Sequence, residues 1–252
     1  MLTETDVIGL PEPTGIGLIA PFDFALDREL WRWLPDHVSL HTTRLPYLPE
    51  PVTVQLASAL GNPHGVRRAT RDVLTPEPVA VAYACTSGSF VDGAAGEAAL
   101  VTAMLAAGAP AAVTTSGALV SALEELQVRR LAVVTPYVDG VTNRLLAYLA
   151  EFGITTSASF GLGLLADIWK ISYADVVRAV TGMDLTGADA LFVSCTNVPT
   201  YDLIAPLEQH LGIPVLTANQ VTMWAALRAA NVTDVAAPGA LFAGRSQDFA
   251  AA

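Results

Sequence analysis

Charged side chains are scarce in this chain of 252 residues: only 15% are Asp, Glu, Lys or Arg, and 52% are hydrophobic. Such a composition excludes an intrinsically disordered chain, which combines low hydrophobicity with high charge. Basic residues are the scarcer kind, with 13 Lys and Arg against 24 Asp and Glu and a formal net charge of −11. The acidic balance argues against nucleic acid or an anionic membrane as a partner. The length allows a large core, as one domain or as two lobes.

Motifs for nucleotides, metals and export are also missing. Residues 15–17 (Gly-Ile-Gly) lack the third glycine and the acidic partner of a dinucleotide site, and no Gly-x-x-x-x-Gly-Lys occurs. The first residues lack the basic and apolar regions of a signal peptide, and the alanine-rich run 98–112 is too short to span a membrane. The histidines show no metal-like spacing: His37, His41, His64 and His210. We therefore expect a cytoplasmic protein with reduced thiols and no metal site.

Only two cysteines are present, Cys85 and Cys195, and both stand in the same local context. Each ends an apolar run, residues 79–84 and 190–194, and each is followed by small polar residues. Such a pattern is typical of a buried parallel strand that carries a thiol at its carboxyl end. A single buried cysteine is usually a small hydrophobic residue. Two in matched contexts indicate a pair with a shared task.

Strand patterns alternate with helical patterns along the chain, which predicts an α/β fold with parallel sheets. Strands are expected at 15–21, 38–45, 79–85, 110–114, 129–137, 154–160, 190–195 and 214–217, and helices at 27–34, 52–60, 64–74, 96–107, 116–126, 141–152, 175–185, 203–211 and 222–230. The order repeats, with matching Pro-containing strand ends at 20–22 and 135–137. We infer two similar lobes. The first comprises residues 1–115, completed by a C-terminal helix at about 220–252, and the second comprises residues 116–219.

The carboxyl ends of the strands are the expected place for a ligand, because open α/β sheets bind ligands there. Two facing lobes would bring Cys85 and Cys195 to one cleft. A thiol ahead of a helix N-terminus is expected to have a lowered pKa. Two thiols on opposite sides of a carboxylic acid can act as base and acid. Hydroxyl, amide and backbone N–H groups beside them suit a carboxylate: Thr86, Ser87, Ser89, Thr196 and Asn197.

Further candidates follow other strands. Tyr137 ends its strand and either aims its hydroxyl into the cleft or packs as an aromatic residue. Thr115 and Ser116 belong to a hydroxyl cluster at a strand-to-helix junction, where helix capping alone would explain one hydroxyl. An apolar wall of the cleft is expected from Phe22, Phe24, Trp169 and Tyr201.

At these residues the chain resembles the aspartate/glutamate racemase superfamily, and within it the maleate cis–trans isomerase and arylmalonate decarboxylase branch. The resemblance runs from about residue 15 to 240 and is carried by residues 134–149, 194–197 and 207–215. It implies two pseudo-symmetric Rossmann-like lobes, each with a four-stranded parallel sheet flanked by helices. The active site would lie in the cleft between them, with neither cofactor nor metal.

By this resemblance Cys85 and Cys195 are the catalytic thiols. Together with the strand-end candidates, the predicted substrate-binding residues are Pro21, Thr86, Ser87, Thr115, Ser116, Tyr137, Thr196 and Asn197. The resemblance also implies that the partner is a small carboxylic acid and that a homo-oligomer forms.

Departures from the relatives' patterns leave several reactions open. The decarboxylase pattern has glycine where Cys85 stands, and the maleate isomerase pattern has Asn soon after the proline, where this chain has Phe22-Asp23-Phe24. We expect a cofactor-independent isomerase of a small carboxylic acid, either a racemase or a cis–trans isomerase. One alternative is an arylmalonate-type decarboxylase that protonates an enediolate from Cys195. The other is a catalytically silent carboxylate-binding protein.

Overall fold

Two four-stranded parallel sheets form the framework of the computed structural model, which describes residues 13–233 and 235–244. The first sheet has the order β2-β1-β3-β4 and the second the order β6-β5-β7-β8, so one topology occurs twice. The strands are β1 (Thr14–Ala20), β2 (Val38–Arg44), β3 (Ala80–Tyr83), β4 (Ala112–Thr114), β5 (Arg130–Tyr137), β6 (Thr155–Leu164), β7 (Ala190–Val193) and β8 (Val215–Thr217). The predicted α/β class and the repeat of two similar lobes are confirmed.

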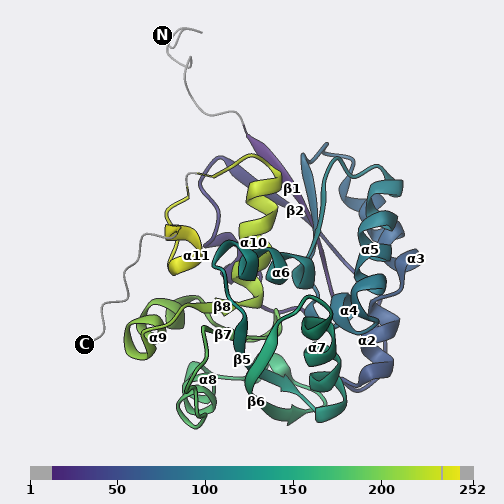
Figure 1. Ribbon diagram of the computed structural model, residues 1–252. Coiled ribbons are helices and arrows are strands. Elements are labelled where there is room, and N and C mark those ends of the chain that lie inside the picture. Colours follow the sequence, from purple (N-terminus) through teal and green to yellow (C-terminus); the bar gives the residue numbers. More distant parts are fainter. Residues whose placement is uncertain (1–12, 234, 245–252) are drawn as a thin grey trace, which may run out of the picture.

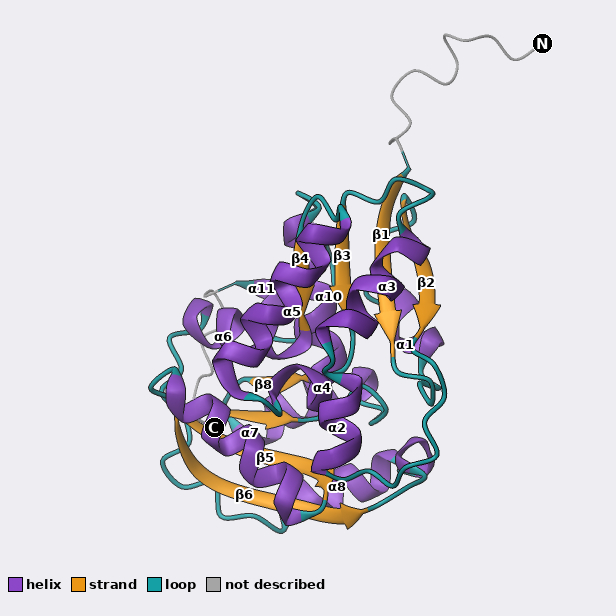
Figure 2. Ribbon diagram, turned by 90° about the vertical axis from the view of Figure 1, so that its right-hand side faces the viewer, coloured by secondary structure: helices purple, strands orange, loops and turns teal. Residues whose placement is uncertain are grey.

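Helices lie on both faces of the sheets (Figures 1 and 2). They are α1 (Asp27–Trp31), α2 (Val54–Leu60), α3 (Pro63–Val73), α4 (Thr86–Phe90), α5 (Gly93–Ala107), α6 (Thr115–Glu125), α7 (Asp139–Glu151), α8 (Tyr173–Thr181), α9 (Ile204–Leu211), α10 (Ala218–Ala229) and α11 (Ala240–Ala243), with 3₁₀ turns η2 (Ile168–Lys170) and η3 (Tyr201–Leu203). Because helices cover both faces, the central strands β3 and β7 are buried along their whole length. The edge strand β6, by contrast, is exposed or half-buried along its whole length.

The two lobes exchange helices. Helix α6 follows β4 of the first sheet, yet its Leu119 and Leu123 belong to the core of the second. Helix α10 follows β8 of the second sheet, yet its Met223 and Leu227 belong to the core of the first. The division into a first lobe completed by a C-terminal segment at about 220–252 and a second lobe stays a prediction. Residues 245–252 of that segment lie outside the described part.

The strands of the first sheet run towards the second lobe. In Figure 2 its strands lie above the second sheet and run down towards it. The carboxyl ends of β1 and β3 therefore face the other lobe, and their following loops lie between the two sheets.

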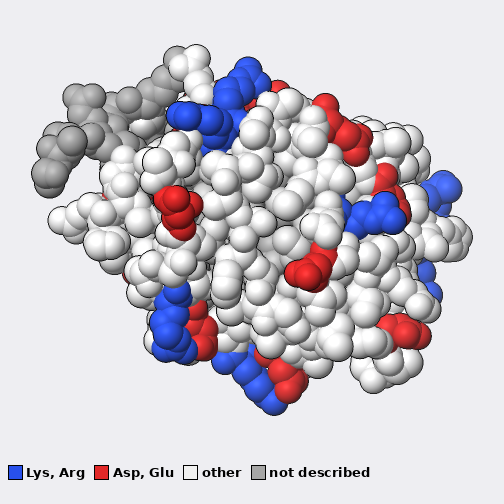
Figure 3. Space-filling view, turned by 60° about the horizontal axis from the view of Figure 1, so that its bottom comes forward, with Lys and Arg blue, Asp and Glu red and all other residues white. Residues whose placement is uncertain are grey.

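The face of the molecule shown in Figure 3 is mostly uncharged, and its Lys and Arg side chains are scattered among Asp and Glu. No basic patch for a nucleic acid gathers on this face. Of the helices in the described ranges, none is both long and apolar enough to cross a membrane.

Candidate active site between the lobes

A pocket lies where the central strands of both sheets end. Pro21 follows β1, Cys85 follows β3, Tyr137 ends β5 and Cys195 follows β7, and all four line the same pocket. Its empty volume is about 430 Å³, counting the mouth that opens to solvent. The chain thus delivers one thiol from each lobe to one space.

Most of the predicted site residues meet in this pocket. Its lining includes Pro21, Cys85, Thr86, Ser87, Tyr137, Cys195, Thr196 and Asn197. It also includes Asp23, which sequence reasoning singled out only as a departure from the maleate isomerase pattern.

Thr115 and Ser116 do not line the pocket, and the prediction that they bind substrate is corrected. Both are fully buried. The hydroxyl of Thr115 lies 2.8 Å from that of Thr222, and the hydroxyl of Ser116 lies 2.6 Å from that of Ser89. Their hydrogen-bonding capacity is used inside the protein, because they follow the edge strand β4 and not a central strand.

The apolar wall of the pocket also differs from the predicted one. Phe22 packs against Tyr47, Phe24 is buried in the first core, and Tyr201 packs against Trp33. Trp169 does not line the pocket either. The apolar residues that do line it come mainly from the segment around α2 and from η2: Val52, Leu56, Ala57, Leu60 and Ile168. No sequence motif marked these positions, because their meeting depends on how the lobes pack.

Cys85 is the residue before α4 and is almost fully buried. Burial raises the pKa of its thiol to about 11, while hydrogen-bonding groups of Tyr83, Gly88 and Ser87 act in the opposite direction. The hydroxyl of Tyr83 also donates to the backbone oxygen of Leu60 at 2.8 Å. A Cβ on Gly88 would collide with that hydroxyl and lie 3.0 Å from the Cys85 sulfur, so a side chain here would have to displace the buried Tyr83.

Cys195 has a backbone φ of 86°, a strained conformation for a residue with a side chain. The backbone N–H of Asn197 donates to its sulfur at 3.4 Å. Burial raises the pKa of the thiol to about 12, against the lowering effect of the Asn197 N–H and the Tyr137 hydroxyl. In this backbone conformation Cys195 lines the pocket.

The prediction that helix N-termini lower the pKa of both thiols was wrong. α4 has only five residues, and Cys195 is followed by a turn and not by a helix. The loss of hydration on burial exceeds the effect of the nearby donors. Both thiols are therefore neutral at pH 7 in the free protein.

Thr86 carries an unused hydrogen-bonding group at the pocket. Its Oγ1 is buried and has no hydrogen-bond partner, although the residue lines the pocket. A buried hydroxyl without a partner costs free energy. Its backbone oxygen meanwhile accepts hydrogen bonds from Ser89 and Ser116, which hold the turn in place. The free hydroxyl fits a ligand acceptor such as a carboxylate oxygen.

Asn197 lines the pocket, but its side chain forms hydrogen bonds within the protein. Its Nδ2 donates to the backbone oxygen of Asp23 at 3.1 Å, and its Oδ1 accepts from the backbone N–H of Ala25 at 2.9 Å. The second cysteine turn thus holds the loop after β1, across the lobe boundary. The predicted contact of Asn197 with substrate stays a prediction.

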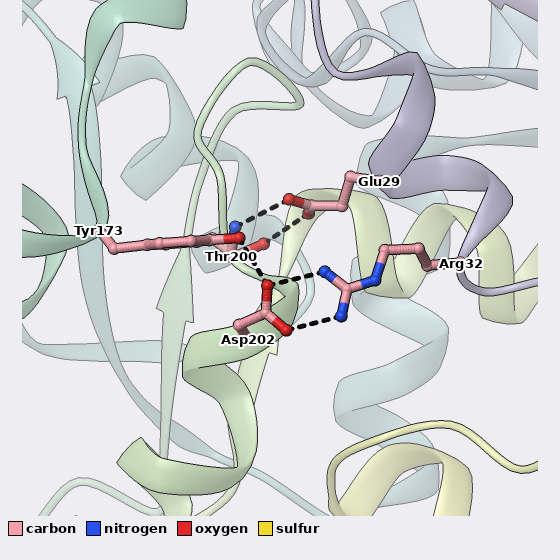
Figure 4. A network of polar contacts seen from close by, with 5 residues as sticks. All are labelled: Glu29, Arg32, Tyr173, Thr200 and Asp202. Atoms are coloured by element: carbon pink, nitrogen blue, oxygen red, sulfur yellow. Dashed lines mark hydrogen bonds and ion pairs between the residues drawn. The ribbon is translucent and has the colours of Figure 1, made fainter.

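A buried carboxylate joins the same turn to α1. Glu29 accepts hydrogen bonds from the backbone N–H and the hydroxyl of Thr200, both at 3.0 Å, and from Nδ2 of Asn219 at 3.0 Å. Asn219 also donates to the backbone oxygen of Thr196 at 3.1 Å. Beside this network, Arg32 forms an exposed bidentate ion pair with Asp202 (Figure 4). Contacts from both lobes therefore position the Cys195 turn.

Within the described ranges, no group of three or more His, Cys, Asp or Glu side chains is arranged to hold a metal ion.

Comparison with known proteins identifies the family of the chain. A family model described as arylmalonate decarboxylase matches residues 65–242. The chain belongs to this family. Membership confirms the predicted superfamily and branch.

Two curated relatives carry different activities in their names. Arylmalonate decarboxylase of Bordetella bronchiseptica is 36% identical over 61% of this chain and 66% of its own length, just under two thirds. Maleate isomerase of Nocardia farcinica is 30% identical over 89% of this chain and 93% of its own length. The relatives of this chain therefore include both an isomerase and a decarboxylase.

A solved structure confirms the fold. A variant of Nocardia farcinica maleate cis–trans isomerase with a covalently bound succinylcysteine intermediate superposes with a TM-score of 0.81 and 26% identity, covering 91% of this chain and 98% of its own. In that enzyme a cysteine forms a covalent bond to the reacting molecule. The predicted isomerase, with a decarboxylase as a close relative, is confirmed at the level of the family.

Proposed function

We propose that the protein is a cofactor-independent isomerase that acts on a small carboxylic acid through Cys85 and Cys195. The observation that carries the proposal is the pocket between the lobes, which is lined by both thiols, one from each lobe. Thr86 and Ser87 hold the substrate carboxylate, the former with its unpaired hydroxyl. Two thiols around one bound carbon supply an acid and a base.

The charge states of the thiols shape the reaction. Both are protonated in the free protein at pH 7, so the proton donor is present from the start. The base forms when one thiol gives its proton to solvent at the mouth of the pocket. The Tyr137 hydroxyl stabilises the Cys195 thiolate. The backbone N–H of Gly88 and the hydroxyl of Ser87 stabilise the Cys85 thiolate, because Tyr83 donates its hydroxyl proton to Leu60.

Two isomerisations use this pair. In racemisation one thiolate removes the proton on the carbon next to the carboxylate, and the other thiol donates a proton to the opposite face. In cis–trans isomerisation the Cys85 thiolate adds to one carbon of a double bond and Cys195 donates a proton to the other. After rotation about the resulting single bond, Cys195 takes a proton back and the Cys85 thiolate leaves, which restores the double bond in the other geometry. The succinylcysteine in the Nocardia maleate isomerase supports a thiol that adds to carbon in a relative.

Decarboxylation is the second candidate, and the family model of arylmalonate decarboxylase favours it. In this reaction the substrate loses carbon dioxide, and Cys195 protonates the resulting enediolate. It requires one thiol as proton donor. The presence of Cys85 as a second thiol at the same pocket supports the isomerase instead.

The test is proton NMR in deuterium oxide with maleate, both enantiomers of aspartate and glutamate, phenylmalonate and phenylglycine. We expect exchange of the proton next to the carboxylate, or interconversion of olefin isomers. Cys85→Ser and Cys195→Ser should each lower the rate at least about a thousandfold, because the serine hydroxyl is a much weaker acid than the thiol. Full activity in both variants would contradict the proposal. Deuterium uptake only with release of carbon dioxide, dependent on Cys195 alone, would establish the decarboxylase.

Location and assembly belong to the same proposal. A cytoplasmic site of action fits two free thiols without a disulfide. Assembly into a homo-oligomer rests on the superfamily resemblance alone, and size-exclusion chromatography with light scattering tests it.

A further inference from the structure

The pocket holds one carboxylate of its own, and in the described part of the chain no cationic side chain lines the pocket beside it. Asp23 lines the pocket together with both cysteines. None of the described residues that line it is Lys, Arg or His. Arg44 lies outside the lining, where it binds the carboxylate of Asp27 at 2.9 Å and the backbone oxygen of Phe24. From there it lowers the pKa of Asp23, but burial has the larger, opposite effect.

The loop fixes Asp23 in this place. The preceding Phe22 packs edge-on against Tyr47 at 5.3 Å between ring centroids, and the following Phe24 is buried in the core. Asn197 holds the loop through the backbone oxygen of Asp23 and the backbone N–H of Ala25. With both neighbours packed and the backbone tied to the other lobe, Asp23 is left at the pocket.

The charge of Asp23 acts on both thiols of the pocket. It raises the pKa of Cys85 and of Cys195, which come from opposite lobes. Partial burial raises the pKa of Asp23 itself, so its charge is incompletely hydrated. A second negative group of a substrate in this space would meet that charge with no cationic side chain in the described pocket lining to offset it.

We infer that Asp23 selects a substrate with a single carboxylate and a hydrogen-bond-donating group, such as an ammonium, and rejects substrates with two carboxylates. The inference rests on the proposed function of the pocket as the site of a small acid. The carboxylate of the substrate binds at Thr86 and Ser87, its donor group binds Asp23, and an apolar substituent lies against Leu56, Ile168 and the other apolar lining residues. Rejection by an unpaired like charge is a recognised source of specificity.

Phenylglycine and phenylmalonate form a matched pair of probes. They share the phenyl ring and one carboxylate, and an ammonium in the first replaces a second carboxylate in the second. Affinities are measured by isothermal titration calorimetry at pH 8 in the Cys195→Ser background, which blocks turnover. Both affinity measurements are repeated after adding Asp23→Asn to this background. They are repeated again with the control Asp36→Asn, which makes the same charge change at an exposed position outside the pocket.

We expect the Cys195→Ser protein, which keeps Asp23, to bind phenylglycine at least about tenfold more tightly than phenylmalonate. Asp23→Asn should lower this preference at least about tenfold, and Asp36→Asn should leave it unchanged. The preference of the unaltered Asp23 protein is informative even if Asp23→Asn folds poorly. Failure to bind phenylglycine, tighter binding of phenylmalonate, or an unchanged preference in folded Asp23→Asn overturns the inference. The expected affinities without deuterium exchange would support the role of Asp23 while contradicting the isomerase.

Discussion

Burial determines the charge state of Cys85 and Cys195 more strongly than the donors that surround them. With a pKa of about 11, only about one Cys85 thiol in ten thousand is ionised at pH 7. The thiolate is the form that attacks an alkylating reagent. Because the pKa is raised, the reactive fraction is small at neutral pH and grows as the pH rises.

We therefore predict that alkylation of both thiols by iodoacetamide accelerates about tenfold per pH unit from pH 7 to pH 10, with no plateau. Mass spectrometry of the peptides that contain Cys85 and Cys195 measures the two rates separately. N-acetylcysteine is the control, since an exposed thiol levels off above its ordinary pKa of about 8.5. A plateau at either cysteine below pH 9, with circular dichroism unchanged, would contradict the raised pKa.

At the scale of the elements, the position of a strand in its sheet decides which residues reach the pocket. The sequence patterns located all eight strands to within a few residues, because buried parallel strands read as apolar runs. They did not reveal the order of the strands. Tyr137 ends the central strand β5 and lines the pocket, whereas Thr115 follows the edge strand β4 and does not. Hydroxyl clusters at both kinds of strand end look alike in sequence.

Helix α4 shows a second limit of sequence reasoning. Its residues 86–90 (Thr-Ser-Gly-Ser-Phe) are mostly poor helix formers, so no helix was predicted between the strand at 79–85 and residue 96. All five are buried, and packing against neighbouring helices imposes the helical conformation. The same dependence on packing hid the apolar wall of the pocket. By contrast, the cysteine pair was found because it depends on local pattern alone.

The link from α1 to the Cys195 turn leads to a prediction for Glu29. Glu29→Ala removes the acceptor of three hydrogen bonds and leaves both buried donors of Thr200 and one N–H of Asn219 without partners. We expect the free energy of unfolding to fall by about 3 kcal/mol. Activity of the remaining folded protein should fall as well, because Asn219 also holds Thr196 beside the second thiol. Urea denaturation followed by circular dichroism measures the first effect.

Asp202→Ala is the matched control at the same boundary. Asp202 pairs with Arg32, and both side chains are substantially exposed, so the ion pair contributes at most about 1 kcal/mol. Equal losses of stability in the two variants would show that Glu29 has no special part in joining the lobes.

At the scale of the whole molecule, the exchange of α6 and α10 couples the lobes. Each core includes a helix whose preceding strand lies in the other sheet, so neither core is complete alone. Unfolding one lobe therefore removes a helix from the other. Cooperative unfolding of both lobes in one transition is the physical consequence.

Substitutions of Met223 and Val176, one in each core, test whether destabilising either lobe also destabilises the other. Met223 of α10 is fully buried in the first core, and Val176 of α8 is buried in the second. Met223→Ala should cost about 3 kcal/mol and Val176→Ala about 2 kcal/mol, from lost burial and the cavity left behind. Hydrogen exchange along a urea titration, read by mass spectrometry, follows peptides of β1 and β5. Both should lose protection at one urea concentration, which falls in either variant. If Met223→Ala exposed β1 at lower urea while β5 stayed protected, the lobes would be independent folding units and the exchanged helices would not couple them.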